Sequence, residues 1–180
     1  MKTHLEFIRD AAKEMPLSSV PFDIRTAKIW HCKYRTLKPL AGLVNLEELV
    51  IAGFPDDSLD FLGELAELRY LSITHLPRVG SLAPLAVLTK LHSLSLATLP
   101  SWDSSKRTVV DSLEPLTRLP ALRHLELFGI CASDRSLAAL EQCTHLQSVR
   151  VGGYTRTETA RFYAATSFTD EYMPQPGFER

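Results

Sequence analysis

The sequence predicts an α/β solenoid in which short parallel strands line one side of each coil and compact helical turns line the other. Two patterns predict this fold. An L-x-x-L-x-L motif, with other apolar residues allowed, recurs at a nearly constant step, and a run of apolar residues spaced three apart precedes each copy. One coil cannot bury its own apolar residues, so the coils are expected to stack around a continuous core.

The strand motif occurs five times clearly and once weakly, with steps of 22, 22, 23, 31 and 24 residues between first positions. Its L-x-L end has a period of two, which is typical of a strand with one buried face. We therefore expect a parallel concave sheet of about six strands. In chain order, with the weak copy first, they are Ile24-Ala27-Ile29, Leu46-Leu49-Ile51, Leu68-Leu71-Ile73, Leu91-Leu94-Leu96, Leu122-Leu125-Leu127 and Leu146-Val149-Val151.

The second pattern places an apolar residue at every third position before each strand, as in Leu37-Leu40-Leu43-Leu46. A long α-helix would alternate steps of three and four, so this spacing predicts 3₁₀ turns or single short helical turns on the convex side. Cys143 occupies one of these positions and is expected to be a small core residue.

These residues resemble the leucine-rich-repeat superfamily in its shorter, 22-residue class, over about residues 24–151. The resemblance implies a right-handed horseshoe and a protein that binds other proteins. One feature departs from the family, which usually carries Asn in the turn after each strand. Apolar residues stand there instead, three of them followed by Pro: Phe54-Pro55, Leu76-Pro77, Leu99-Pro100, Ile130 and Tyr154.

The regions outside the repeats are expected to cap the ends of the core. In residues 1–23, Thr3–Met15 reads as an amphipathic helix that begins with a capping box of Thr3 and Glu6. In residues 152–180, Thr157–Ala165 is expected to form a short cap helix, and the Pro-containing tail after Ser167 is expected to be loose. The alternative for the tail is a short linear motif that docks elsewhere.

Composition excludes several function classes. The 180 residues have a net charge of −1, and no basic-aromatic stripe indicates a nucleic-acid surface. No apolar run predicts a signal peptide or a membrane span. Three cysteines without C-x-x-C spacing favour neither a disulfide framework nor a zinc site, and a reducing cytoplasm is the expected setting.

Charge is unevenly distributed along the chain. Residues 41–68 contain seven acidic residues and no basic one. They are interpreted either as an ordinary solvated surface or as an acidic rim that selects a basic partner.

The fourth coil is longer than the others, because Leu96 and Leu113 are 17 residues apart where other coils need 8 to 10. The excess falls at residues 101–108. Insertions in repeat proteins often lie on the binding side, and Trp102 with Lys106 and Arg107 suits an interface anchor. A tolerated surface insertion is the alternative.

The strand period also predicts which side chains face outward on the concave sheet. Small polar residues fall in the middle of that face and aromatic residues at its borders, a composition that suits a protein surface or a helix. The expected partner-binding residues are Trp30, Glu48, Tyr70, Ser72, Thr74, His75, Ser93, Ser95, Trp102, Lys106, Arg107, His124, Glu126 and Phe128.

No catalytic, cofactor or metal motif is present in the sequence. A Ser/His/acid set from Ser93, His124 and Glu126 is possible on paper but weak, since neighbours on a strand fan apart. The sequence therefore predicts a non-enzymatic adaptor, regulatory subunit, inhibitor or immunity-type protein that binds another protein and no small-molecule substrate, membrane or cofactor. The alternatives are a structural subunit that uses its convex face or ends and, less favoured, an enzyme component.

Overall fold

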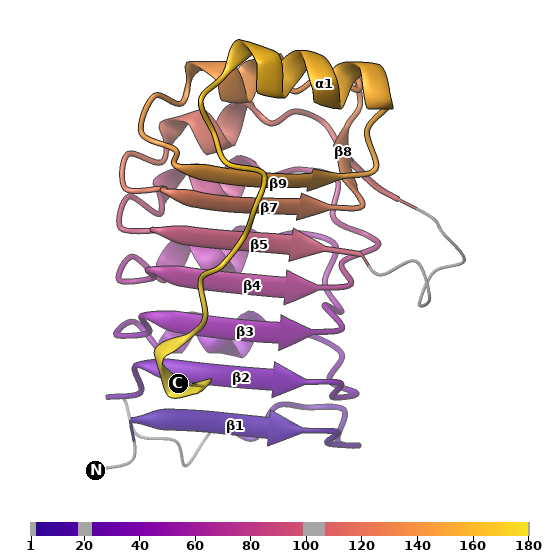
Figure 1. Cartoon of the computed structure of the whole chain (residues 1–180). Helices are drawn as coiled ribbons and strands as arrows, with labels where there is room; N and C mark the ends of the chain where they lie inside the picture. The colour runs from indigo at the N-terminus through magenta and orange to yellow at the C-terminus, as the bar shows by residue number, and fades with distance from the viewer. Residues whose placement is uncertain (1–2, 18–22, 99–106, 180) are drawn as a thin grey trace.

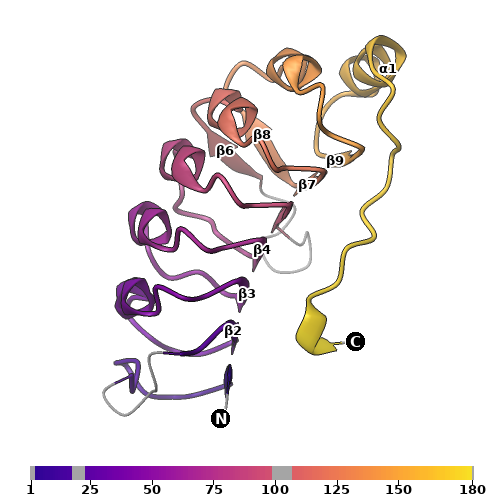
Figure 2. The ribbon, with the colours of Figure 1, turned by 90° about the vertical axis from the view of Figure 1, so that its left-hand side faces the viewer.

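The computed structural model describes residues 3–17, 23–98 and 107–179, and these residues stack as coils along an arc (Figures 1 and 2). A seven-stranded parallel sheet lines the inner side in the order β1-β2-β3-β4-β5-β7-β9. Its strands are β1 (His4–Ile8), β2 (Thr26–Trp30), β3 (Glu48–Ala52), β4 (Tyr70–Thr74), β5 (Ser93–Ala97), β7 (His124–Phe128) and β9 (Ser148–Gly152).

The strands pair in the register that the repeat spacing predicts. Leu49 lies opposite Leu71, and Leu71 lies opposite Leu94, so equivalent positions of successive copies align across the sheet. These three side chains are fully buried, because alternate residues of a strand point to the same face and this face is covered by the outer turns. The inner core is thus a set of leucine rows, one residue per coil.

The convex side consists of 3₁₀ turns, as predicted. Each backbone N–H donates to the carbonyl oxygen three residues earlier, with a donor–acceptor distance of 2.9 Å: Leu40 to Leu37, Leu43 to Leu40 and Leu46 to Leu43. The spacing of three between leucines is therefore the spacing of the 3₁₀ hydrogen bond itself. The five outer turns are η1 (Lys38–Gly42), η2 (Asp60–Glu64), η3 (Ala83–Val87), η4 (Glu114–Arg118) and η5 (Ala138–Gln142).

The predicted N-terminal cap helix is wrong: residues 4–8 form strand β1, which adds a seventh strand to the sheet. His4 pairs with Thr26, and Phe7 pairs with Ile29, so β1 lies 22 residues before its partner, as a further repeat would. The open edge of β2 offers backbone groups that a helix would leave without partners. Burial of Met15 supports the same view, because Met15 lies 22 residues before Leu37 and joins the core as Leu37 does.

The apolar turns after the strands contribute to the core. Phe54, Leu76 and Ile130 are buried, and Phe54 stacks on Phe61 with ring centroids 6.0 Å apart. The residue directly before this apolar turn residue has a positive φ in several coils. It is Gly53 (φ 85°) in one coil and a histidine, His31 or His75, in two others.

The longer coil carries two additional short strands. These are β6 (Thr108–Val110) and β8 (Ile130–Ala132), which pair in parallel as a separate two-stranded sheet. Most of the predicted insertion, including Trp102 and Lys106, lies outside the described residues.

The C-terminal cap helix is present as α1 (Arg156–Ala165), which covers the last coil (Figure 1). Its Phe162 is fully buried, and Thr155 caps it by accepting a hydrogen bond of 3.1 Å from the backbone N–H of Glu158. Among the described residues, no helix is long and apolar enough to cross a membrane.

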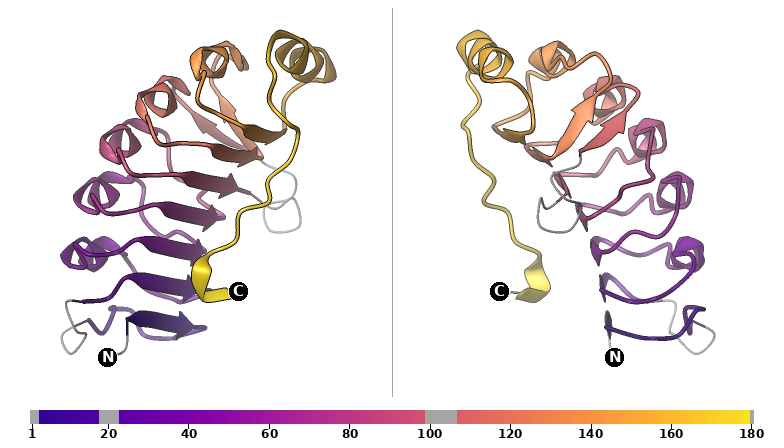
Figure 3. Two further views of the ribbon diagram at one scale, coloured as in Figure 1. Left: turned by 60° about the vertical axis from the view of Figure 1, so that its left-hand side comes forward. Right: turned by 90° about the vertical axis from the view of Figure 1, so that its right-hand side faces the viewer.

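The sequence suggested a loose tail after α1, but the structure holds this segment in place. Residues 169–179 run back across the concave side from β9 to β2 and end in the 3₁₀ turn η6 (Gly177–Glu179) (Figures 2 and 3). The prediction failed because the contacts that hold the far end of this segment, to Glu48 and Lys28, come from residues more than a hundred positions away in sequence.

Candidate interaction surface

The outward residues of the strands form the continuous columns that the sequence predicts. Glu48, Tyr70, Ser93 and His124 follow one another across β3, β4, β5 and β7 in direct register. The column of Ser72, Ser95, Glu126 and Arg150 lies beside it. Parallel strands lie ~4.8 Å apart, so each column is a row of adjacent side chains on the concave face.

The middle of this face is recessed. Ser93 and Ser95 of β5 are only 4% and 5% exposed, although they point toward the concave side. Larger side chains stand on both sides of them, and Tyr70, Glu126 and Phe128 remain half-buried. The small residues are therefore the floor of a groove, and the aromatic and charged residues are its walls.

One wall is built around Phe128. The guanidinium of Arg150 lies 5.5 Å from the Phe128 ring centroid, and it also pairs with Glu126 at 3.3 Å. Glu126 accepts a hydrogen bond of 2.6 Å from the Ser95 hydroxyl. Gly152 lies beneath the ring, where a Cβ atom would come within 2.6 Å of it.

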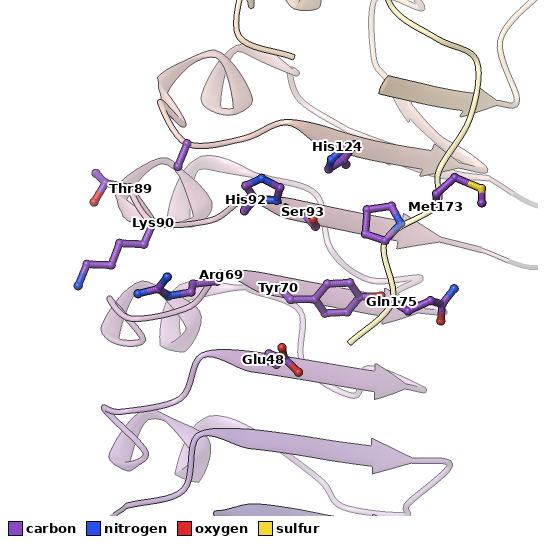
Figure 4. A pocket seen from close by; sticks show the side chains of 12 residues that line it. Glu48, Arg69, Tyr70, Thr89, Lys90, His92, Ser93, His124, Met173 and Gln175 are labelled. Atoms are coloured by element: carbon purple, nitrogen blue, oxygen red, sulfur yellow. Dashed lines mark hydrogen bonds between the residues drawn. The ribbon is translucent and has the colours of Figure 1, made fainter. Parts of the chain in front are cut away.

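The tail divides the groove into two hollows. A hollow of about 820 Å³ lies near the beginnings of the strands, and one of about 540 Å³ lies near their ends. Tyr70, Pro174 and Gln175 line both hollows, so the tail is the partition between them. Figure 4 shows the first hollow, with the labelled strand residues and the tail that carries Met173 and Gln175.

Two histidines stand side by side in the first hollow (Figure 4). The rings of His92 and His124 are 5.3 Å apart, and Nδ1 of His124 is 2.8 Å from the Ser148 hydroxyl. Burial lowers the pKa of both histidines, and the nearby Arg123 lowers each of them further. Both are therefore biased toward the neutral imidazole. No group of three metal-ligating side chains was found in the described part of the chain.

Burial also acts on the tyrosines in the groove. It raises the pKa of Tyr70, and it raises the pKa of Tyr172, from the tail, well beyond the usual range. The neighbouring Glu126 carboxylate acts in the same direction on both phenols. Both side chains therefore stay neutral and serve as apolar bodies with a hydroxyl.

Ten of the fourteen predicted partner-binding residues occupy outward positions on the sheet: Trp30, Glu48, Tyr70, Ser72, Thr74, Ser93, Ser95, His124, Glu126 and Phe128. His75 is different, because it lies in the turn after β4 with φ 67°. Arg107 is exposed just before β6, whereas Trp102 and Lys106 lie outside the described residues.

The Ser/His/acid set does not assemble. Ser93 contacts His92 at 3.2 Å, His124 contacts Ser148, and Glu126 contacts Ser95. Each member thus bonds to a residue outside the set, as expected for side chains that fan apart along strands.

The acidic stretch at residues 41–68 does not form one open rim. Glu47 pairs with Arg25, Glu67 pairs with Lys90 at 2.6 Å, and Glu48 accepts a hydrogen bond from the tail. Asp56 is buried and accepts hydrogen bonds from the backbone N–H of Leu37 at 2.8 Å and from the Thr36 hydroxyl. These acids serve mainly to join neighbouring coils and the tail.

Sequence reasoning missed several residues of the groove. Lys28 and Arg150 occupy outward strand positions, but nothing in the sequence marked them as partner-binding residues. His92 was missed because it lies just before its strand, outside the predicted columns. Tyr172, Pro174 and Gln175 were missed because the tail was expected to be loose. The two prolines and the aromatic residues of the tail were the only signal that could have indicated a docked segment.

Comparisons with known proteins agree with this architecture. No protein-family model and no curated protein matches the sequence. Among solved structures, the chain is similar to an internalin C2 from Listeria monocytogenes, with a TM-score of 0.59 and 28% identity over 72% of this chain and 52% of that one. It is also similar to a second internalin from the same organism, InlF, with a TM-score of 0.53, 18% identity, and coverage of 88% and 50%. The chain thus spans about half the length of these structures.

Proposed function

Because this chain is a leucine-rich-repeat protein, we propose that it is a non-enzymatic protein–protein interaction module whose concave sheet, with the loop at residues 101–108, binds another protein. The adaptor, regulatory-subunit and inhibitor roles are specific forms of this proposal, as is action in the cytoplasm. The observation that carries the proposal is the groove: a recessed floor of small polar residues between walls that carry Tyr70 and Phe128.

The chemistry of the groove supports a protein partner rather than a small substrate. Aromatic residues and arginine are enriched at interface anchors, because they bury a large apolar surface while keeping a polar edge. Tyr70, Phe128 and Arg150 supply such groups on one face. The two hollows are open troughs along the sheet, lined by residues from several coils.

Site-specific photo-cross-linking tests the proposal. A benzophenone amino acid at Thr74, on the concave sheet, is expected to capture a partner from lysate of the source cells. The matched control is the same amino acid at Val87, which is 58% exposed on outer turn η3. Capture at Val87 instead would favour the alternative of a structural subunit that uses its convex face.

Substitutions then test the site with the captured protein. Tyr70→Ala, Phe128→Ala and Trp102→Ala are each expected to weaken binding at least ~10-fold, the usual effect of removing an interface anchor. Unchanged affinity in all three variants contradicts the assignment of the site. Catalytic turnover by the purified protein that is lost in His124→Ala would favour the enzyme alternative.

A further inference from the structure

The tail occupies the groove as a peptide ligand would. It enters beside β9, where the Thr169 backbone N–H donates to Gln147 (3.1 Å) and the Thr169 carbonyl accepts from Val149 (3.0 Å). It then crosses the strands toward the first coils (Figures 1 and 3). Pro174 and Pro176 favour an extended backbone, because proline fixes φ and has no backbone N–H to donate.

Four kinds of contact hold the tail at successive points. The Tyr172 ring is half-buried beside Tyr70, and Pro176 is buried. The Gly177 backbone N–H donates a hydrogen bond of 2.8 Å to the Glu48 carboxylate. At the far end, the Phe178 ring lies 4.5 Å from that of His4, and Glu179 pairs with Lys28 at 2.5 Å. The pattern is an aromatic residue, two prolines, a second aromatic residue and an acid.

The same contacts are weak enough to exchange. The Lys28–Glu179 pair is partly exposed, and such pairs contribute little. The buried Tyr172 hydroxyl finds no well-formed hydrogen bond among the described residues, which weakens the fit. The tail holds its place largely because it is tethered, since a short tether gives an effective concentration on the order of 1 mM.

We propose that the concave groove is a binding site for an extended, proline-containing protein segment with aromatic anchors and an acidic end, and that residues 169–179 fill it as a ligand in cis which an outside segment must displace. This rests on the proposed function, because it specifies what kind of segment the interaction module takes. Recognition of an extended proline-containing segment by an aromatic-lined groove is a general mode of peptide binding.

Binding of the tail in trans tests the proposal. A chain that ends at Asp170 keeps the Thr169 pairing and the hydrogen bond of 2.9 Å between Tyr163 and Asp170. A fluorescein-labelled peptide of residues 171–180 is expected to bind this shortened chain, measured by fluorescence anisotropy. For a peptide Kd on the order of 100 µM, the tethered tail should weaken peptide binding to the full chain about 10-fold.

Charge reversal fixes the register of the bound peptide. Lys28→Glu in the shortened chain should weaken peptide binding, and a peptide carrying Glu179→Lys should restore it. A peptide with Tyr172→Ala and Phe178→Ala should bind at least ~10-fold more weakly. Equal binding of all peptides to both chains would overturn the proposal, because it would indicate attachment without the observed register.

A second variant covers the case in which the shortened chain does not fold. The full chain with Tyr172→Ser, Phe178→Ser and Glu179→Lys keeps its length but weakens the tail, and it should bind the native peptide more tightly than the unsubstituted chain does. Absence of peptide binding to a folded variant, checked by circular dichroism, overturns the proposal. A dimer of the full chain that the shortened chain does not form would place the tail in a second copy and overturn occupancy in cis.

The two proposals fail separately. If the peptide binds in the observed register but Tyr70→Ala and Phe128→Ala leave capture of the partner unchanged, the groove is a peptide site and the partner site assigned under the proposed function is wrong. If those substitutions abolish partner binding but the peptide does not bind the folded variants, the proposed function stands and the tail is not a ligand mimic.

Discussion

The carboxylate of Glu158 in α1 accepts a hydrogen bond of 2.7 Å from the backbone N–H of Leu137, at the start of the preceding outer turn. Glu158 also pairs with Arg161 at 2.7 Å, and Arg161 reaches Glu141 at 2.6 Å. The cap helix is therefore fastened to the η5 coil by two contacts, the Glu158–Leu137 hydrogen bond and the Arg161–Glu141 ion pair. Asp56 and Leu37 repeat the relationship near the other end of the arc.

Glu158→Gln is expected to lower the free energy of unfolding by about 1–2 kcal/mol, because a charge-assisted hydrogen bond and a partly exposed ion pair are weakened. The Arg161 and Leu137 contacts lower the pKa of Glu158 to about 2. Its contribution is therefore complete above the unfolded value near 4.5 and is lost as pH falls toward 2. Urea unfolding at pH 7 and pH 3 measures this, with Glu64→Gln, on the exposed side of η2, as the control. An equal pH dependence in Glu158→Gln and the unsubstituted chain would contradict it.

Asp56→Ala should cost about 1–3 kcal/mol, because it leaves the buried N–H of Leu37 without its acceptor. Asp57 is its exposed neighbour and supplies the matched control: Asp57→Ala should change stability by less than ~0.5 kcal/mol. Thermal unfolding of both variants separates a structural carboxylate from a member of an acidic recognition rim. Equal effects of the two substitutions would contradict the structural role of Asp56.

Gly152→Ala should destabilise the chain by about 1–3 kcal/mol and move Phe128, because a Cβ at this position would lie 2.6 Å from the ring. Gly42→Ala, in η1, is the control. A Cβ added at Gly42 would have no atom within 4 Å, so the change should be neutral or slightly stabilising. Chemical denaturation measures stability, and NMR shifts of the Phe128 ring report its displacement. An unchanged Phe128 spectrum in Gly152→Ala would contradict the tight contact.

Acid should weaken the concave side through its histidines. Burial lowers the pKa of His92 and His124 below 6.5 in the folded chain, so the folded state binds fewer protons than the unfolded state in this range. Their contribution is complete above 6.5 and falls as pH drops below that value toward the lower folded pKa values. NMR titration should give midpoints below 6.5 for both. Because Glu171 raises the pKa of His124, Glu171→Gln should lower the His124 midpoint further while leaving that of His92 nearly unchanged. A midpoint above 6.5 for either ring would contradict the assignment.

The solenoid was predictable because each coil repeats the same local signals. The leucine spacing indicates the 3₁₀ turns, and the L-x-L period fixes the faces of the strands, so the columns that begin at Glu48 and Ser72 followed from sequence alone. Each of these features depends on residues within one or two coils.

The two ends of the chain were not predictable in the same way. The first coil has Leu5 and Phe7 at the strand positions but lacks the flanking leucines, and an amphipathic helix fits the same few residues equally well. Only the exposed edge of β2 selects the strand. The tail is a stronger case, since its position depends on Lys28 and Glu48, which the sequence pattern does not connect to it.

The contact between Lys28 and Glu179 joins residues 151 positions apart, in a fold whose coils otherwise contact their neighbours. The tail therefore connects the two ends of the curved solenoid directly. A less curved solenoid would lengthen the distance that the tail must span, and local unfolding of the first coils would remove the residues that hold its end. Release of the tail by a partner should therefore do more than free the groove: it would let the curvature of the whole array relax and the end coils unfold independently of one another.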